Sequence, residues 1–316
     1  MPLCSLEEAL EDLKAGKFVI VVDDEQRENE GDLVMFAETV TPEAVNFAVT
    51  EARGLLCMPI IGERLDELDI PLMISQNTST KNHTAFTVSV DYNQGTTTGI
   101  SAQDRAATIQ ALIDPEVRGD KMSRPGHLFP LRYHPGGVLA RAGHTEAIVD
   151  LCVIAGKYPA GIVCEIMNED GTMAQRPELE AFAEKHGIKI GTIADLIQYR
   201  NLYDTTIERV DLRTVTTQHG DFELHTYKDN ISDCVHYALA IGDVTEEEPC
   251  LVRVQVLNTL RDVLQTTRPG HSDTWSLNDS LAHVAEAGTG VVVLVGQVFH
   301  QQDELSQVVH FPEVPP

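Results

Sequence analysis

The stretch KFVIVVDDEQRENEGD, residues 17–32, joins an apolar run to ten residues that carry six carboxylates. An apolar run without alternation predicts a strand buried on both faces, as in the interior of a layered α/β structure. The acidic residues that follow have two interpretations. They form a solvated loop, which is the commoner role of like-charge runs, or they hold a cation or a substrate at the end of the strand.

Apolar patterning around this stretch predicts helices and strands that alternate, but not in the regular order of a doubly wound sheet. Predicted helices occupy residues 5–14, 42–54, 102–113, 146–156, 177–187 and 193–202, and predicted strands occupy 17–22, 55–61, 83–92 and 162–168. Thr41, Ser101 and Thr145 are predicted N-caps, and Gly187 is a predicted helix end. The fold class predicted for this part is α+β, with mixed-sheet α/β layers.

The segment 114–137 lacks a clear period and is rich in Pro, Gly, His and Arg. An irregular segment of this length is uncommon unless it is functional or disordered. The segment is therefore expected to be either a functional loop or a disordered one.

A chain of 316 residues is long for one domain and comfortable for two. We expect an N-terminal domain over residues 1–203 and a smaller, β-rich α/β domain over 204–316. The predicted strands of the second domain are 207–217, 221–229, 236–244, 250–258 and 290–298, with a helix near 280–287.

Composition limits the function. The formal net charge of −26 argues against nucleic acid or an anionic membrane as the main partner, and no run reaches the length of a membrane span. The six cysteines are widely spaced and form no C-x-x-C pair, so neither a zinc knuckle nor a disulfide framework is indicated. These features predict a cytoplasmic protein, in which local arginines would be needed to bind an anionic substrate.

Two residues outside the acidic stretch are candidates for acid–base chemistry. His127 lies in RPGHLFPL (124–131), where two prolines stiffen the backbone around an imidazole that titrates near neutral pH. Glu165 lies inside the apolar strand IVCEIM, where burial would favour the protonated carboxyl and suit a general base. A structural histidine and a buried Glu paired with an arginine are the alternatives.

A third candidate is the glycine-rich sequence GGVLARAGHTEA, residues 136–147. Its glycines permit close backbone approach, and Arg141 offers a bidentate fork for phosphate. Thr145 and the free N–H groups of the next helix form an anion site, while His144 could ligate a metal shared with the acidic loop. An ordinary glycine-rich turn with a capping threonine is the alternative.

Five segments in order resemble the 3,4-dihydroxy-2-butanone 4-phosphate synthase family of riboflavin biosynthesis over about residues 5–200. They are RENEGD (27–32), GTTTGISAQDRA (95–106), RPGHLFPL (124–131), RAGHTEAIVDL (141–151) and PAGIVCEIMNEDGTMA (159–174). The resemblance implies conversion of D-ribulose 5-phosphate to L-3,4-dihydroxy-2-butanone 4-phosphate and formate. It also implies Mg²⁺ or Mn²⁺ as cofactor and a homodimer with sites near the subunit interface.

The resemblance assigns roles to single residues. It implies Glu28 and His144 as metal ligands and His127 and Glu165 as the residues needed for turnover. The implied substrate contacts are Arg27, Glu28, Asp32, Arg141, Thr145 and Glu165. Asp23, Asp24 and Glu25 are expected only to flank the site, and Glu30 is a possible acid–base partner. Where the family has a second glycine this chain has Ala142, which would be strained if the position required a positive φ.

The second domain resembles the start of GTP cyclohydrolase II. That family needs a zinc site of three cysteines, Cys-x(10)-Cys-x-Cys, yet the corresponding residues 258–281 contain none. His236, His271 and His283 lack a ligand-like pattern. We expect a truncated, degenerate domain without zinc and without GTP hydrolysis. The alternatives for the whole chain are a non-catalytic regulator that binds sugar phosphate and a scaffold for a separate cyclohydrolase.

Overall fold

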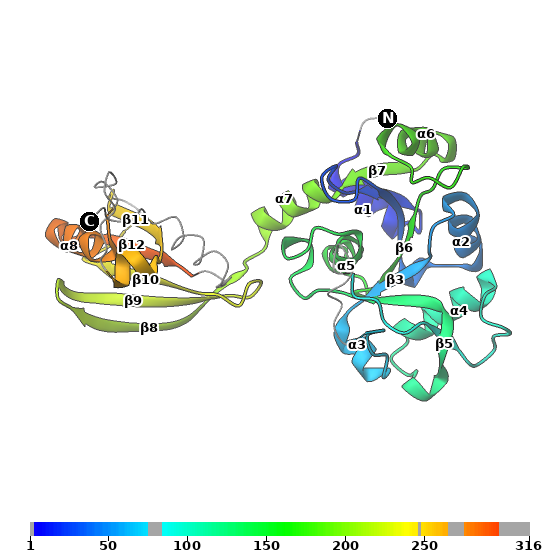
Figure 1. Cartoon of the computed structure of the whole chain (residues 1–316), viewed down its shortest axis with the longest axis horizontal. Helices are drawn as coiled ribbons and strands as arrows, with labels where there is room; N and C mark the ends of the chain where they lie inside the picture. Colours follow the sequence, from blue (N-terminus) through cyan, green and yellow to red (C-terminus); the bar gives the residue numbers. More distant parts are fainter. Residues whose placement is uncertain (1–2, 75–83, 246–247, 265–274, 297–316) are drawn as a thin grey trace, which may run out of the picture. The chain divides into compact units, whose positions relative to one another are not determined.

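The computed structural model describes residues 3–74, 84–245, 248–264 and 275–296. The chain forms two compact units, Met1–Asp204 and Thr205–Pro316 (Figure 1). Within the described ranges, no helix is both long enough and apolar enough to cross a bilayer.

The first unit is built on a seven-stranded sheet with the order β4-β5-β3-β6-β2-β1-β7. Its strands are β1 (Val19–Val22), β2 (Gly31–Phe36), β3 (Cys57–Ile60), β4 (Val90–Tyr92), β5 (Met122–Arg132), β6 (Gly161–Glu165) and β7 (Lys189–Thr192). The pairs β1–β7 and β3–β5 are parallel and the other pairs are antiparallel. The predicted mixed sheet is confirmed.

Two layers of helices cover this sheet. The helices are α1 (Leu6–Lys14), α2 (Pro42–Phe47), α3 (Gly62–Glu67), α4 (Ala102–Ile113), α5 (His144–Ile154), α6 (Arg176–His186) and α7 (Ile193–Tyr203). Helices α2, α4 and α6 share one core with Ile20 and Val22, whereas α1, α5 and α7 share another with Val19 and Val21. Figure 1 shows α2 and α5 on opposite sides of the sheet. Strand β1 is therefore buried on both faces, as its sequence predicts.

Local signals placed several helix ends correctly. Ser5 forms a capping box with Glu8, Thr41 and Ser101 cap α2 and α4, and Gly187 ends α6 with φ 65°. Thr145, in contrast, is not a cap. Helix α5 already begins at His144, and its N-cap Gly143 makes no side-chain capping bond.

Two predicted elements are corrected, and β2, α3 and β7 were not predicted. The helix expected over 42–54 is α-helical only to Phe47 and continues as a π-helical turn, Ala48–Ala52, which ends at Arg53 with φ 70°. The strand expected over 83–92 is regular only at β4, and its first residue lies outside the described ranges. Strand β2 was not predicted, because the charged run before it hides where the apolar segment begins.

The segment 114–137 is not a single loop, because Met122–Arg132 forms strand β5 and Gly119–Lys121 forms a 3-10 turn before it. This strand pairs with β3 and with β4, and the pairing with β4 passes from Asp91↔Ser123 to Val90↔Leu128. Residues 124–127 therefore bulge out of the ladder, where a proline is tolerated because no ladder hydrogen bond is lost. Tertiary pairing thus overrides the local composition, and the bulge presents His127.

The second unit contains a five-stranded sheet with the order β11-β12-β10-β9-β8. Its strands are β8 (Ile207–Thr217), β9 (Gly220–Asp229), β10 (Val235–Ile241), β11 (Leu251–Val256) and β12 (Gly290–Val295). Helix α8 (Leu277–Ala287) packs on one face, over Phe222, Leu239 and Val292. The predicted strands and helix are confirmed, whereas His271 and the expected strand end at residues 297–298 lie outside the described ranges.

Candidate active site

The acidic loop between β1 and β2 is organised by Asp23. Its carboxylate accepts the backbone N–H groups of Glu28 (3.0 Å) and Glu30 (2.9 Å) and pairs with Arg27 (2.9 Å). The Asp23 side chain is completely buried. The expectation that Asp23 only flanks the site is therefore wrong, because satisfying backbone donors within the turn requires a buried acceptor.

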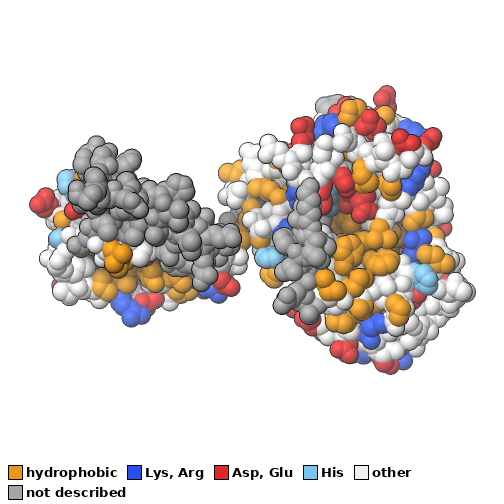
Figure 2. Space-filling model, viewed as in Figure 1, with side chains coloured by type: hydrophobic (Ala, Val, Ile, Leu, Met, Phe, Trp, Pro, Cys, Tyr) orange, Lys and Arg blue, Asp and Glu red, His pale blue; other side chains and the backbone are white. Residues whose placement is uncertain are grey.

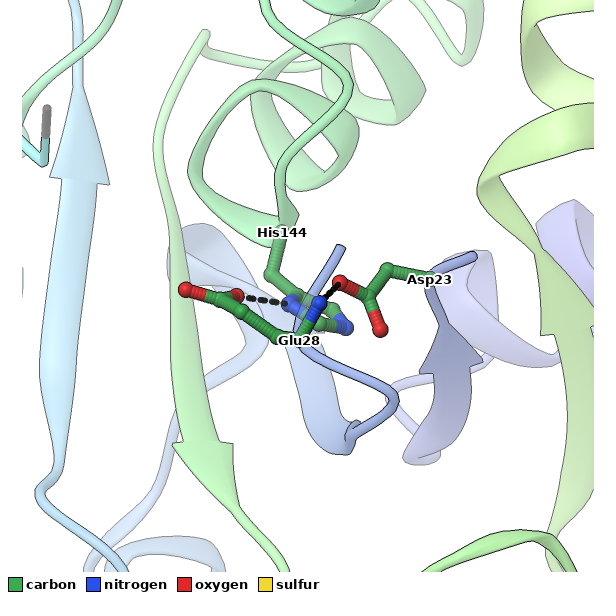
Figure 3. A group of neighbouring side chains, drawn as sticks. All are labelled: Asp23, Glu28 and His144. Carbon is green, nitrogen blue, oxygen red and sulfur yellow. Dashed lines mark hydrogen bonds and ion pairs between the residues drawn. The ribbon is translucent and has the colours of Figure 1, made fainter. Parts of the chain in front are cut away.

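Glu28 and Asp32 meet His144 at the start of α5. Nδ1 of His144 lies 3.7 Å from a Glu28 carboxylate oxygen and 3.9 Å from Oδ1 of Asp32. Figure 3 shows Asp23, Glu28 and His144 converging from the acidic loop and the helix start, and one potential ligand atom from each lies within 4.8 Å of the others. Spacing of this kind is suited to a single cation.

Electrostatics at this cluster are dominated by burial. Burial raises the pKa of Asp32 to about 7, and neighbouring carboxylates act in the same direction. Burial alone would lower the pKa of His144, but Asp32 and Glu28 more than offset this and raise it to about 9. Burial also raises the pKa of Glu30. The cluster therefore concentrates negative charge that a positive ion or a proton must balance.

Two buried atoms of the cluster have no hydrogen-bond partner in the described residues: Oδ1 of Asp32 and Nε2 of His144. Buried polar atoms are normally satisfied, so two unsatisfied polar atoms at one place suit a site that binds a ligand. Carboxylate oxygens with an imidazole are a donor set that Mg²⁺ and Mn²⁺ accept. The residues present fit a divalent cation.

Glu165 lies at the end of β6, directly across the ladder from Asp32 on β2. It is half-buried, and its side chain accepts the backbone N–H of Leu55 at 2.9 Å. Gly54 permits this arrangement, since a Cβ there would lie 2.7 Å from the Glu165 amide nitrogen and closer still to its carbonyl oxygen. The structure thus brings Glu165 beside the acidic cluster.

His127 is held by Asp91, a residue that the sequence did not single out. One carboxylate oxygen of Asp91 lies 2.7 Å from Nδ1 of His127, and the other accepts the His127 backbone N–H at 2.8 Å. Gly99, with φ 93°, packs against both side chains. In the described residues, the hydrogen bonds and ion pairs of His127 reach neither Asp32 nor His144. Asp91 could not be found from sequence, because the bulge in β5 creates this register.

Arg141 and Arg27 converge at the N-terminus of α5. A Cβ on Gly143 would lie 2.8 Å from Nη2 of Arg27 and closer still to Nη1 of Arg141, so both guanidinium groups lie against this glycine. Arg141 also pairs with Glu146 and donates to Thr84 at 2.7 Å. No side chain caps this helix end, and Thr145 lies in its first turn. Two guanidinium groups beside an uncapped helix N-terminus form an anion site.

The strain considered for Ala142 is absent. Positive φ among the described non-glycine residues occurs at Asn29, Arg53, Asp69 and Asp233. Ala142 therefore has an ordinary backbone conformation, and its methyl group packs at the edge of the core beside α5.

Comparisons with known proteins agree with this architecture. The model of the 3,4-dihydroxy-2-butanone 4-phosphate synthase family matches residues 7–199, and that of GTP cyclohydrolase II matches residues 208–311. The 3,4-dihydroxy-2-butanone 4-phosphate synthase of Pseudomonas aeruginosa is 51% identical over 315 residues, which cover 100% of this chain and 85% of the relative. The riboflavin biosynthesis protein RibBA of Synechocystis sp. is 49% identical over 297 residues, covering 93% of this chain and 53% of that protein.

Solved structures extend the likeness to the whole fold. RibBX, a two-domain 3,4-dihydroxy-2-butanone 4-phosphate synthase from A. baumannii, has 45% identity and a TM-score of 0.77, covering 97% of this chain and 85% of its own. A 3,4-dihydroxy-2-butanone 4-phosphate synthase in complex with two magnesium ions has 41% identity and a TM-score of 0.61, covering 64% of this chain and 99% of its own.

The layered mixed sheet, with buried carboxylates, a histidine and two arginines gathered at one end, defines a mixed α/β protein with a site suited to a cation and an anion. More narrowly, the chain belongs to the 3,4-dihydroxy-2-butanone 4-phosphate synthase family. Its activity is that lyase reaction of riboflavin biosynthesis, and it carries a second domain of the GTP cyclohydrolase II family.

Proposed function

We propose that the first unit converts D-ribulose 5-phosphate to L-3,4-dihydroxy-2-butanone 4-phosphate and formate at the site described above, with Mg²⁺ or Mn²⁺ as cofactor. The observation that carries this proposal is the convergence of Glu28, Asp32 and His144, with unsatisfied buried atoms on two of them. The magnesium ions in the related solved structure support a divalent metal in this chain as well.

In this proposal Glu28 and His144 hold the metal, and Asp23 keeps their loop in place. When bound, the divalent cation acts as a Lewis acid toward oxygens of the substrate. Asp32, buried between these residues and Glu165, contacts the substrate hydroxyls. Its raised pKa allows it to accept or donate a proton near neutral pH.

Phosphate recognition is assigned to the N-terminus of α5. Arg27 and Arg141 supply guanidinium groups, Thr145 supplies a hydroxyl, and the uncapped helix end supplies N–H groups. Anchoring the phosphate at this end directs the carbonyl end of the sugar toward the acidic cluster.

Proton transfers next to the ketone are assigned to Glu165 and His127. Glu165 is fixed by its hydrogen bond from Leu55 and lies across the ladder from Asp32. Asp91 holds Nδ1 of His127, which leaves Nε2 to exchange protons with the substrate.

We also propose a homodimer that completes the site. His127 makes its contacts with Asp91 and Gly99 and lies in the exposed part of β5, apart from the metal cluster. Leu55 and Ile100, which neighbour these catalytic segments, are 43% and 53% exposed. Figure 2 shows apolar side chains spread over the face of the first unit, next to acidic side chains. A second subunit would cover such a surface and bring its own residues to the site.

For the second unit we propose a degenerate cyclohydrolase-like domain without GTP hydrolysis. Residues 251–316 contain no cysteine, and a zinc site built from three thiolates needs them. We further propose a cytoplasmic location, in keeping with six free cysteines.

The direct test is formate release from ribulose 5-phosphate by the full chain. We expect release with Mg²⁺, loss of release in excess EDTA, and recovery on adding Mg²⁺ or Mn²⁺. Glu28→Gln should lose most of the rate while circular dichroism stays unchanged, and Glu25→Gln, an exposed neighbour in the same loop, is the matched control. A full chain that releases no formate with Mg²⁺ refutes the proposal. Consumption of GTP, followed by chromatography, would contradict the assignment of the second unit.

A further inference from the structure

The geometry points to Arg200, near the end of α7, as a positioning residue for the glycine-rich turn (residues 136–143) that presents Arg141. This inference deepens the proposed function and rests on it, because it takes Arg141 to bind the substrate phosphate. None of the candidate site residues lies on α7, so the helix supplies no side chain to the proposed chemistry.

Arg200 reaches across from α7, and two of its guanidinium nitrogens are engaged. Its Nε donates to Asp204 at 2.6 Å, and its Nη1 donates both to Asp150 at 2.8 Å and to the carbonyl oxygen of Gly136 at 3.1 Å. The side chain is only 15% exposed. A planar guanidinium with several fixed donors can satisfy these three acceptors together, which a lysine ammonium on a flexible stem cannot do in the same geometry.

Asp150 is the centre of this arrangement. It lies on α5, its side chain is 3% exposed, and its carboxylate also accepts the hydroxyl of Tyr133 at 2.9 Å and the backbone N–H of Val138 at 2.8 Å. A carboxylate buried to this degree is stable only when paired and hydrogen-bonded. Arg200 and Asp150 together therefore fix the backbone of the turn at Gly136 and Val138.

Gly137 shows how closely the turn lies against the pair. It has φ 59°, and a Cβ on it would overlap both Nη1 of Arg200 and the carboxylate of Asp150. Only glycine meets both requirements, the left-handed backbone and the close approach to a buried ion pair. The turn is thus shaped to lie against Arg200 and Asp150.

The turn connects this contact to Arg141. The carbonyl oxygen of Gly137 accepts the backbone N–H groups of Ala140 (3.0 Å) and Arg141 (2.9 Å), and Arg141 in turn accepts the N–H of Gly143 at 2.8 Å. A displacement of Gly136 or Gly137 would therefore move the backbone from which the Arg141 side chain extends. An error of about 1 Å in a group that binds substrate can cost on the order of 10²-fold in rate.

The test compares KM and kcat for ribulose 5-phosphate in the full chain, using Arg200→Ala, Arg141→Ala and the double variant. We expect Arg200→Ala to raise KM by about tenfold with a smaller change in kcat, because phosphate binding is weakened before chemistry is. If Arg200 acts through Arg141, the double variant should be no worse than Arg141→Ala alone. Free guanidinium ion, added to Arg200→Ala, should restore part of the lost affinity.

Arg261→Ala is the matched control. Like Arg200, Arg261 donates to a carboxylate and to a carbonyl oxygen, from Nε to Asp262 at 2.8 Å and from Nη2 to Val256 at 3.2 Å, but it belongs to the second unit. It should leave KM unchanged. If Arg200→Ala does not fold, Arg200→Lys carries the same comparison, since it keeps the positive charge while losing the fork.

Three outcomes separate the claims. A KM that is unchanged in Arg141→Ala refutes the phosphate role of Arg141 and with it the proposed function of this turn. If Arg141→Ala raises KM but the Arg200 variants lower only the thermal midpoint, Arg200 is structural and this inference fails. It also fails if the effects of the two substitutions multiply in the double variant.

Discussion

Asp91 binds His127 with both oxygens of one carboxylate, one to the ring and one to the backbone. This fixes the position of the ring and, because an ionised carboxylate only accepts, it places the proton of the neutral imidazole on Nδ1. The other ring nitrogen is then an acceptor that is ready to take a proton. A residue remote in sequence thus determines what His127 can do.

We expect Asp91→Asn to lower kcat by about 10- to 100-fold with little change in KM. This loss is smaller than the full rate contribution of a general acid–base residue, because His127 itself is retained. An amide that accepts the backbone N–H of His127 turns its NH₂ toward Nδ1, which favours the wrong tautomer. Formate release under saturating substrate measures the effect.

Asp120→Asn is the control, since Asp120 is an exposed carboxylate whose ion pair is with its neighbour Lys121. A normal kcat in Asp91→Asn would show that this pair does not orient His127 for turnover.

At the same scale, residue types revealed part of the site and concealed the rest. His144 and Arg141 could be proposed because their residue types suit a metal and a phosphate, whereas Glu28 was singled out from the acidic loop only by the family resemblance. Asp23 could not be told from its solvated neighbours Asp24 and Glu25, because the difference lies in which backbone N–H groups the folded turn points inward. Such information arises only once the loop has its conformation.

The strands decide where the site residues face. Asp32 and Glu165 are neighbours because β2 and β6 pair in a register that puts one opposite the other. Composition predicted the buried strand β1 and the mixed sheet, since both depend on local apolar runs. It failed for β2 and β5, since charge hides the start of one and prolines suggest that the other is a loop.

Packing between β3 and β6 leads to a prediction at this scale. Gly54→Ala should lower the free energy of unfolding by about 1–3 kcal/mol, because its Cβ would overlap the backbone of Glu165 and force the strands apart. Activity should fall with it, since Glu165 would be displaced. Chemical denaturation followed by circular dichroism measures the first effect and formate release the second.

Gly191→Ala in β7 makes the same change where a Cβ would meet only Sγ of Cys4, at 3.9 Å. It should be close to neutral. Equal stability of the two variants would contradict the close packing at Gly54.

Over the whole chain, the sequence anticipated a β-rich second unit, and its strands are present. A relative and a solved structure match this chain through both units, whereas the match to another synthase structure covers 64% of this chain and 99% of its own. The first unit therefore corresponds to a protein that exists on its own. What the second unit contributes could not be deduced from patterning, because a sheet and a helix of this kind serve many functions.

The last turn of α7 bears on where the first unit can be separated from the second. A chain cut after residue 199, where the family match ends, would lack Arg200 and Asp204. A chain cut after residue 206 would keep both. We expect the longer piece to retain the KM of the full chain and the shorter piece to show a KM raised by about tenfold, as measured by formate release. Equal KM values would contradict this.

The end of the family match therefore lies a few residues before the end of the segment that the active site needs. Anyone who dissects a fused enzyme by the limits of its family match would remove the arginine that Asp150 requires. The loss would resemble a dependence on the neighbouring domain, although only the last turn of α7 had been removed from the first unit.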